Sequence, residues 1–272
     1  MEQKKILLVN QLEKDSCVAL GAMEPLLAAY GHNISVLPTE KASGLKGERQ
    51  DAKEALEFMR GALYVVNYTK TVYDIILSGY LNGSAEADQL LDLFWKQKRA
   101  LRVVDPSFGD AGALYEGVSE SFLPSIRNIA SKADILIPNV TEAEYLVYGA
   151  SSPGGKSLGN LIELVKGLTD LGAKNVVITG ARVIKEHIVC GIDANGESFF
   201  EAYDVQPGHF AGTGDVYTAL LLGEYLRGRS LRESAIRAAA CVSAAMKACS
   251  DAVHPEKGFP IGQLKEYVKK RA

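Results

Sequence analysis

The sequence has few cysteines and no pattern that would pair them or place them around a metal. Cys17, Cys190, Cys241 and Cys249 are the only four in 272 residues, and they form neither a C-x-x-C motif nor a ligand spacing with histidine. A disulfide-rich secreted domain and a zinc site are therefore disfavoured. Reduced thiols in a cytoplasmic protein are expected instead.

Long apolar runs and an excess of basic charge are also lacking. No segment approaches the ~18 consecutive apolar residues that span a bilayer. The apolar run that follows "MEQKK" is too short for a signal peptide. The formal net charge is −3, and no long basic run occurs. Neither a membrane nor a nucleic acid is therefore expected as a partner, and the chain is predicted to be a cytoplasmic globular protein.

Short apolar segments alternate with amphipathic segments along most of the chain. Strands are expected at 4–10, 34–38, 63–68, 74–81, within 100–110, at 133–139 and 175–180, followed by a hairpin about Asn195-Gly196. Helices are expected at 16–31, 51–61, 84–99, 119–132, 141–149, about 161–172 and from 214 to the end. This alternation predicts one α/β domain over 1–272, a central, mostly parallel sheet with helices on both faces. The polar segment 39–53 is expected to form a small flap.

Some single residues receive structural interpretations. Thr141 is expected to cap the helix over 141–149, with Glu144 three residues later completing a capping box. Trp95 is expected in the helix core with its apolar neighbours, and His32 on the surface or in a cap.

The stretch "HFAGTGDVYTALLLGEYLRG" at 209–228 places a Gly-Thr-Gly-Asp turn directly before an apolar helical segment. Gly212 and Gly214 allow a tight turn whose N–H groups lie at the positive end of the helix, which suits a phosphoryl group. Asp215, in the first helical turn, would be close enough to accept the proton of an attacking hydroxyl. An acidic residue near a helix start is also common for structural reasons, so the turn by itself leaves both interpretations open.

Other strand ends carry acidic or amide side chains. "DPSFGD" supplies Asp105 and Asp110, whose carboxylates suit hydrated Mg²⁺ because no thiol or imidazole accompanies them. "PNVTEAE" supplies Asn139 and Glu142. Turn chemistry and stabilisation of a helix dipole are the structural alternatives. Since ligands of open α/β sheets bind beyond the carboxyl ends of the strands, we expect these groups to converge with the Gly-Thr-Gly-Asp turn.

Taken together, "GY", "DPxxGD", "PNxxEAE", "VVITG" and "GTGD" occur in an order and at spacings that resemble the ribokinase-like superfamily. More narrowly, the chain resembles its vitamin B6 branch, the pyridoxal/pyridoxine/pyridoxamine kinases. The likeness runs through most of the chain and is strongest over 74–228. It implies a ribokinase-like fold and transfer of the ATP γ-phosphoryl group to the 5′-hydroxymethyl group of the B6 ring. It also implies Mg²⁺ as a cofactor, commonly a homodimer, and a flap over the site.

The resemblance assigns roles to the residues that match its motifs. It makes Asp215 the catalytic base and the backbone of Gly212, Thr213 and Gly214 the anion hole. It implies ATP contacts at Asp105, Asn139, Glu142, Thr179 and Gly180. It implies Mg²⁺ contacts, directly or through water, at Asp105, Asp110 and Glu142. Acceptor contacts are implied at Tyr80, Asn10 and Ser43.

The N-terminal third departs from the family pattern Asn-Asp-hydrophobic-Ser-Gly-x-Gly. "NQLEKDS" places Gln11, Glu13, Lys14 and Ser16 at the Asp, Ser and two Gly positions, and "SGLKG" matches the family's Ser-Asn-His-Thr-Gly only at Ser43 and Gly47. These changes stiffen the backbone and add a charge where a neutral hydroxyl would meet the ring. Either the acceptor is a different alcohol or the acceptor pocket has degenerated. A chain path that leaves Glu13 and Lys14 on the surface is the structural alternative.

These observations predict an ATP-dependent kinase of a vitamin B6 vitamer or a related small alcohol. A hydroxymethylpyrimidine kinase is the alternative enzyme. A nucleotide- or vitamer-binding homologue with little turnover is the alternative from another class. The intact turn at 212–215 favours an enzyme, whereas the altered segments 10–16 and 43–47 favour the binding protein.

Overall fold

The structure is a computed structural model that describes residues 2–13, 16–39, 52–205, 210–248, 257–259 and 261–270. The strands are β1 (Lys5–Asn10), β2 (Asn33–Pro38), β3 (Ile75–Ser78), β4 (Leu101–Val104), β5 (Gly109–Asp110), β6 (Ala113–Leu114), β7 (Ile135–Leu136), β8 (Asn175–Val183), β9 (Glu186–Ile192) and β10 (Ser198–Tyr203). The helices are α1 (Leu20–Ala29), α2 (Ala52–Tyr68), α3 (Ser84–Lys96), the 3-10 turn η1 (Glu120–Phe122), α4 (Leu123–Ala130), α5 (Val140–Tyr148), α6 (Leu158–Leu171), α7 (Thr213–Leu226), α8 (Leu231–Ala248) and α9 (Ile261–Lys270).

The main sheet has eight strands in the order β10-β9-β8-β7-β4-β3-β1-β2. The six strands from β8 to β2 along this order are parallel, and β9 and β10 extend the sheet as an antiparallel hairpin. The short strands β5 and β6 form a separate ribbon after β4. The expected mostly parallel sheet is confirmed.

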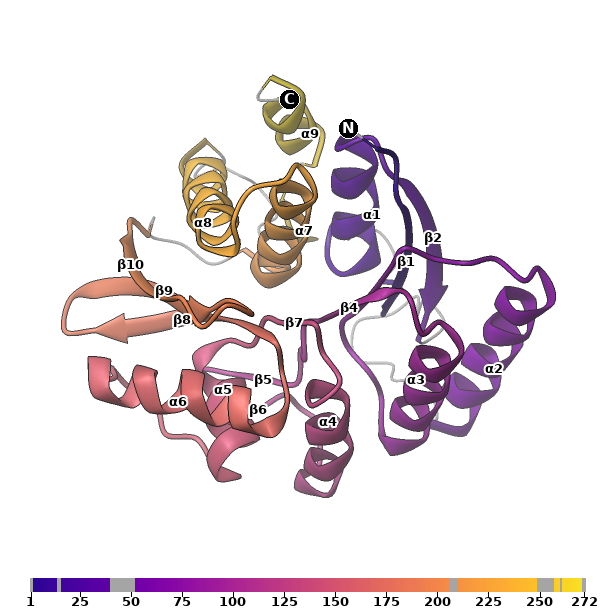
Figure 1. Cartoon of the computed structure of the whole chain (residues 1–272), viewed down its shortest axis with the longest axis horizontal. Coiled ribbons are helices and arrows are strands. Elements are labelled where there is room, and N and C mark those ends of the chain that lie inside the picture. Colours follow the sequence, from indigo (N-terminus) through magenta and orange to yellow (C-terminus); the bar gives the residue numbers. More distant parts are fainter. Residues whose placement is uncertain are drawn as a thin grey trace.

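Helices cover both faces of the sheet (Figure 1). α1, α7, α8 and α9 lie on one face, and α2 to α6 lie on the other. β1 serves both layers, because its side chains alternate: Ile6 and Leu8 join one apolar cluster, while Leu7 and Val9 join the other. All four are fully buried, which is typical of a parallel strand covered on both sides. Among the described helices, none is both long and apolar enough to cross a bilayer.

The strand expected at 63–68 is wrong, because these residues continue α2. Tyr64, Val65 and Tyr68 are exposed on this helix, so their strand-like composition does not reflect a place in the sheet. Once the helix has formed, each added residue gains a local hydrogen bond, and that outweighs a weak strand propensity. Most of the expected flap, 40–51, lies outside the described residues.

Two further expectations are corrected. Trp95 is 66% exposed with the Lys98 ammonium group 4.7 Å from its ring, whereas Phe94 carries the core contact of α3. His32 is buried at the start of β2, where its Nδ1 accepts a hydrogen bond from the backbone of Lys4.

The cap of α5 also differs from expectation. The N-cap is Asn139, whose side chain accepts a hydrogen bond from the Glu142 backbone while the Glu142 carboxylate accepts one from the Asn139 backbone. Asparagine is a strong N-cap residue, and Glu142 stands at the third helical position that a capping box needs. Thr141 instead accepts a hydrogen bond from the backbone of Gly112.

Candidate active site

The predicted site residues that the structure describes meet at one edge of the sheet. Because β1, β3, β4, β7 and β8 are parallel, their carboxyl ends share this edge. Asn10 ends β1, Tyr80 and Asp105 follow β3 and β4, and Asn139 follows β7 and pairs with Thr179 through an isolated bridge. The N-terminus of α7 carries Asp215 to the same place, since Asn10 and Asp215 are hydrogen-bonded.

The turn before α7 has a glycine-containing backbone that a ligand can approach closely. Gly212 is the N-cap of the helix with φ 73°, a left-handed conformation that favours glycine, and an added Cβ would come within 2.9 Å of Val18. Nothing lies within 4 Å of the position that a Cβ would take at Gly214, which is exposed. Thr213 is tied back to the Phe210 carbonyl at 2.6 Å. The first N–H groups of a helix have no partner inside it, so this turn offers donors to an anion.

Asp215 is held by donors from the opposite side of the site. One carboxylate oxygen accepts the backbone N–H of Ala19 at 2.8 Å, and the other accepts the side-chain amide of Asn10 at 3.3 Å. The oxygen of the Asn10 amide accepts the backbone N–H groups of Gln11 and Tyr80. An added Cβ at Gly79 would lie 2.3 Å from this amide, so glycine is needed where the chain passes it.

The Asp215 carboxyl titrates near neutrality. Burial is the main cause that raises the pKa of Asp215 to about 7, and the charges of Asp105 and, more weakly, Glu13 act in the same direction. The hydrogen bonds from Ala19 and Asn10 oppose the shift. A base with a pKa near the working pH can both accept and release a proton readily.

Asp105 and Glu142 form a pair of neighbouring acidic side chains. Asp105 is buried, and its two oxygens accept the hydroxyls of Ser107 at 2.9 Å and Thr218 at 2.7 Å. Burial raises the pKa of Asp105 despite these hydrogen bonds. For Glu142, burial and the neighbouring charge of Asp105 raise the pKa well above its usual value. Two desolvated carboxyls near each other would be stabilised by a cation.

These oxygen donors fit Mg²⁺, which prefers carboxylates and keeps part of its water shell. Asp105 and Glu142 would share the ion's charge. Asp110 is exposed and accepts the backbone N–H of Ala111 at 2.7 Å, which leaves it open to water. Within the described ranges, no group of three acidic, histidine or cysteine side chains is arranged as a ready-made metal cage. The donor set therefore suits an ion that is completed by water and by ligand phosphates.

Asn139, Thr179 and Gly180 lie together, as their expected common role requires. The Thr179 backbone donates to the Pro138 carbonyl at 2.9 Å, and Asn139 donates through its side chain to the Gly109 carbonyl at 2.7 Å. Gly180 has φ 69°, and an added Cβ there would contact Asn139. This arrangement joins β7, β8 and the β5 turn into one wall of the site.

Two of the three expected acceptor contacts, Asn10 and Tyr80, lie next to each other in the structure. Asn10 is almost fully buried with its amide engaged, so it positions Asp215 and the backbone of Tyr80. The Tyr80 side chain is half-buried, and its hydroxyl contacts Asn82. Ser43 lies outside the described residues, as does Lys14.

Glu13 is exposed yet close to the site. Gln11 and Ser16 both donate to its carboxylate, at 3.1 and 3.2 Å. The backbone N–H of Leu20 donates a hydrogen bond to the carbonyl of Gln11. The negative charge of Glu13 contributes to the raised pKa of Asp215. Whether Glu13 contacts the acceptor stays a prediction.

Sequence reasoning missed several residues at this edge. Thr218 stands one turn after Asp215 on α7, and that spacing could have indicated a second functional position on the same helix face. Tyr115 lies within electrostatic reach of four acidic groups of the site, and burial is the main cause that raises its pKa. Ala19 contributes only its backbone N–H, for which the side-chain sequence has no signal.

Comparison with known proteins identifies the family. Residues 71–261 match the family model described as phosphomethylpyrimidine kinase. A pyridoxal kinase of Dictyostelium discoideum is 25% identical over 272 residues, which cover 92% of this chain and 83% of that protein.

Solved structures share the fold. Pyridoxal kinase from Lactobacillus plantarum matches with a TM-score of 0.87 and 23% identity, over 99% of this chain and 98% of that one. Pyridoxal kinase from Leishmania donovani, solved with ADP and pyridoxamine, matches with a TM-score of 0.80 and 21% identity, over 98% and 96% of the two chains. The expected ribokinase-like fold is confirmed. Since the family model covers most of the sequence, the chain belongs to the phosphomethylpyrimidine kinase family of ATP-dependent small-molecule kinases.

Proposed function

We propose that this protein transfers the γ-phosphoryl group of ATP to the hydroxymethyl group of a vitamin B6 vitamer or a closely related alcohol. The observation that carries the proposal is the position of Asp215. Its carboxyl, with a pKa of about 7, stands in the first turn of α7, directly after a glycine turn with an exposed backbone. The names of the related kinases support the vitamer as the acceptor.

In this mechanism Asp215 accepts the proton of the acceptor hydroxyl as that oxygen attacks the γ-phosphorus atom of ATP, and the bond from this phosphorus to ADP breaks so that ADP leaves. Asn10 and Ala19 hold the carboxylate in place through hydrogen bonds. The N–H groups of 212–214 face the transferred phosphoryl group, whose charge the positive helix end stabilises. In such reactions the protein acts mainly by positioning and by electrostatic stabilisation.

Mg²⁺ would be held by Asp105 and Glu142, with Asp110 acting through water. When bound, it supplies positive charge between these carboxylates and the ATP phosphates. Asn139, Thr179 and Gly180 would line the nucleotide, since they form one wall of the site.

The acceptor side is where this chain departs from its relatives. Glu13 adds an exposed carboxylate near Asp215. A site that hydrogen-bonds one ligand rejects others strongly when its polar groups change. We therefore expect slower phosphorylation of pyridoxal than an enzyme with the usual serine at this position would show. Hydroxymethylpyrimidine is the second candidate acceptor, because a relative from Aquifex aeolicus is named hydroxymethylpyrimidine/phosphomethylpyrimidine kinase.

We further propose a cytoplasmic homodimer. Cys17 and Cys190 are free thiols, as in a reducing compartment. Tyr64, Val65 and Tyr68 form an exposed apolar face on α2, of the kind that a subunit interface covers.

Release of ADP, measured with pyridoxal, pyridoxine, pyridoxamine, hydroxymethylpyrimidine and simple sugars, tests the proposal. Phosphorylation of at least one vitamer is expected, with the phosphate on the hydroxymethyl oxygen. Faster turnover of hydroxymethylpyrimidine than of every vitamer would reassign the acceptor. Binding of ATP without turnover of any of these alcohols would show that the homologue binds ligands and does not catalyse.

A further inference from the structure

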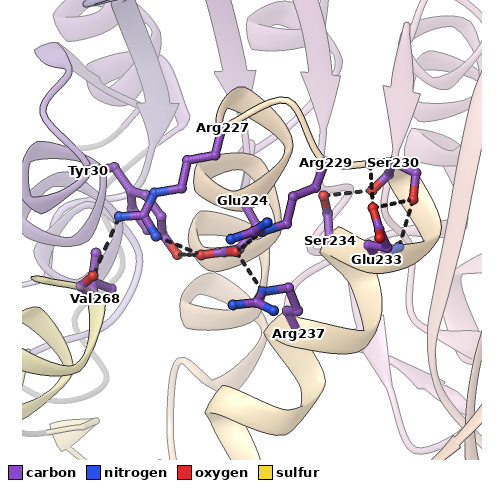
Figure 2. A network of polar contacts seen from close by, with 9 residues as sticks. All are labelled: Tyr30, Glu224, Arg227, Arg229, Ser230, Glu233, Ser234, Arg237 and Val268. Carbon is purple, nitrogen blue, oxygen red and sulfur yellow. Dashed lines mark hydrogen bonds and ion pairs between the residues drawn. The ribbon is translucent and has the colours of Figure 1, made fainter. Parts of the chain in front are cut away.

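Three arginines surround one buried carboxylate at the far end of α7 from the candidate active site. Figure 2 shows Glu224 at the centre of this arginine cluster, which consists of Arg227, Arg229 and Arg237. Glu224 is separated from Asp215 by nine positions of α7, or about 13 Å along the helix axis. The cluster is therefore a separate place in the molecule.

Arg227 has a structural role. Its side chain is 6% exposed, its Nη1 donates to Glu224 at 3.0 Å, and its guanidinium lies 4.3 Å from the ring centre of Tyr30. Tyr30 donates its hydroxyl to the same Glu224 oxygen at 2.9 Å. Arg227 and Tyr30 therefore already provide the buried Glu224 carboxylate with one cation and one further hydrogen-bond donor.

Arg229 and Arg237 are bound differently. Each donates only its Nε to the second oxygen of Glu224, at 2.6 and 2.8 Å. Their side chains are 33% and 40% exposed. An arginine that serves only to pair a carboxylate commonly uses its two-pronged edge. Here the terminal Nη groups of both arginines have no hydrogen-bond partner among the described residues, so their forks remain available.

The charges in this cluster are not balanced. Although burial opposes it, the hydrogen bonds from Arg229, Tyr30 and Arg237 keep the pKa of Glu224 below its usual value, so it is ionised. Among the residues that the structure describes, Glu233 is a second carboxylate that interacts with Arg229 and Arg237, and its oxygen accepts hydrogen bonds from Ser230. Three guanidinium groups thus face two carboxylates.

Two guanidinium groups anchored to one oxygen atom repel each other, and a further anion that accepts from both partly exposed forks would relieve this repulsion. The arrangement is pre-organised because a buried residue holds both Nε atoms. The N-terminus of α8, which begins directly after Ser230, adds a positive helix end nearby.

We propose that Arg229 and Arg237 form a binding site for a phosphate group, distinct from the candidate active site. Planar forks that present paired N–H donors match a phosphate dianion in shape and charge. The ligand is free phosphate or a phosphate monoester, since both present the same dianionic oxygens.

Calorimetric titration with inorganic phosphate, at constant ionic strength set by chloride, tests this site. The informative variant is Arg229→Lys/Arg237→Lys, because lysine keeps the charge beside Glu224 but lacks the planar fork. The matched control is Arg232→Lys on α8, the helix that also carries Arg237. The guanidinium of Arg232 pairs with Glu201, and its side chain is 61% exposed. Wild type and the control are expected to bind phosphate with a Kd of roughly 1 mM or tighter. The double variant is expected to lose this binding at least tenfold.

Equal phosphate affinity in all three proteins would overturn the proposal, as would no phosphate binding by wild type. If the double variant unfolds, the test uses the Nε–Hε NMR signals of Arg229 and Arg237 in the wild-type protein. These signals are assigned from the single lysine variants. They must shift with phosphate and stay unmoved with chloride. Titration with phenyl phosphate separates the sources: tighter binding than phosphate assigns a monoester, and equal binding assigns free phosphate.

Discussion

At the scale of single residues, the chemistry of this protein depends on carboxyl groups whose surroundings differ. Asp215 is tuned to titrate near neutrality, whereas Glu224 on the same helix is kept ionised by arginines. Both are partly or fully buried acids. The difference comes from their partners, since Asp215 faces Asp105 and Glu224 faces cations.

Replacing Asp215 by asparagine is expected to reduce phosphoryl transfer about 10²–10⁴-fold, because a general base contributes an amount of this order. ATP affinity should change little, since the proposed nucleotide contacts are made by other residues. Turnover is measured by ADP release and affinity by calorimetry. Unchanged turnover in Asp215→Asn would remove this carboxylate from the mechanism.

The pH dependence follows from the same residue. With a pKa of about 7, Asp215 is protonated and inactive at low pH, so kcat should rise as pH increases through that value. Glu13→Gln removes a negative charge that disfavours the ionised base, so the pKa of Asp215 should fall and the acidic limb should move to lower pH. The control is Glu116→Gln, an exposed glutamate that does not influence Asp215. An identical acidic limb in wild type and Glu13→Gln would show that Glu13 does not act on the base.

At the scale of elements, the N-terminus of α5 joins a helix cap to the candidate nucleotide wall. Asn139→Ala should cost about 1 kcal/mol for the cap, with a further loss because the buried Gly109 carbonyl loses its donor. Ser157→Ala breaks the capping box of α6 at an exposed position and serves as the control. Both variants should unfold more easily in urea, but only Asn139→Ala should weaken ATP binding. Equal ATP affinity in the two would separate this cap from the nucleotide site.

The β4 end and the start of α5 bring Asp105 and Glu142 together, and from this pair we predict that nucleotide binding depends on a cation. Removing Mg²⁺ with a chelator is expected to weaken ATP binding at least tenfold, or about 1.4 kcal/mol, because the paired carboxylates then repel the phosphates. Asp105→Asn should reduce this dependence. Calorimetry with and without Mg²⁺ measures both effects, and equal affinity of wild type with the chelator would contradict the assignment.

At the scale of the whole molecule, the sheet divides the chain into two layers with different surfaces. The layer of α2 to α6 exposes Tyr64 and Tyr68, whose rings stack with centres 6.2 Å apart. If this face is the subunit interface, Tyr64→Ser/Tyr68→Ser should sediment as a monomer while wild type sediments as a dimer. Tyr148→Ser, an exposed change on α5, should leave the dimer intact. A monomeric wild type, or a dimeric double variant, would rule out this interface.

The sequence by itself was sufficient for the architecture and for the family, because both depend on local patterns. Apolar periodicity predicts the alternating strands and helices, and parallel strands oblige the acidic strand ends to meet at one edge. The motif order around Asp105, Asn139 and Asp215 was enough to indicate a kinase. Sequence reasoning failed where residue composition and the surrounding structure disagree. Residues 63–68 have the composition of a strand but lie on a helix.

Only the tertiary structure decided what each polar group contacts. Asn10 is predicted to contact the acceptor, and the structure adds that its amide is hydrogen-bonded to Asp215 and to the backbone of Tyr80, 70 positions away. The pKa of Asp215 and the arginines around Glu224 likewise depend on burial and on charges from distant segments. Such effects act through space over a few ångströms and leave no periodic trace along the chain.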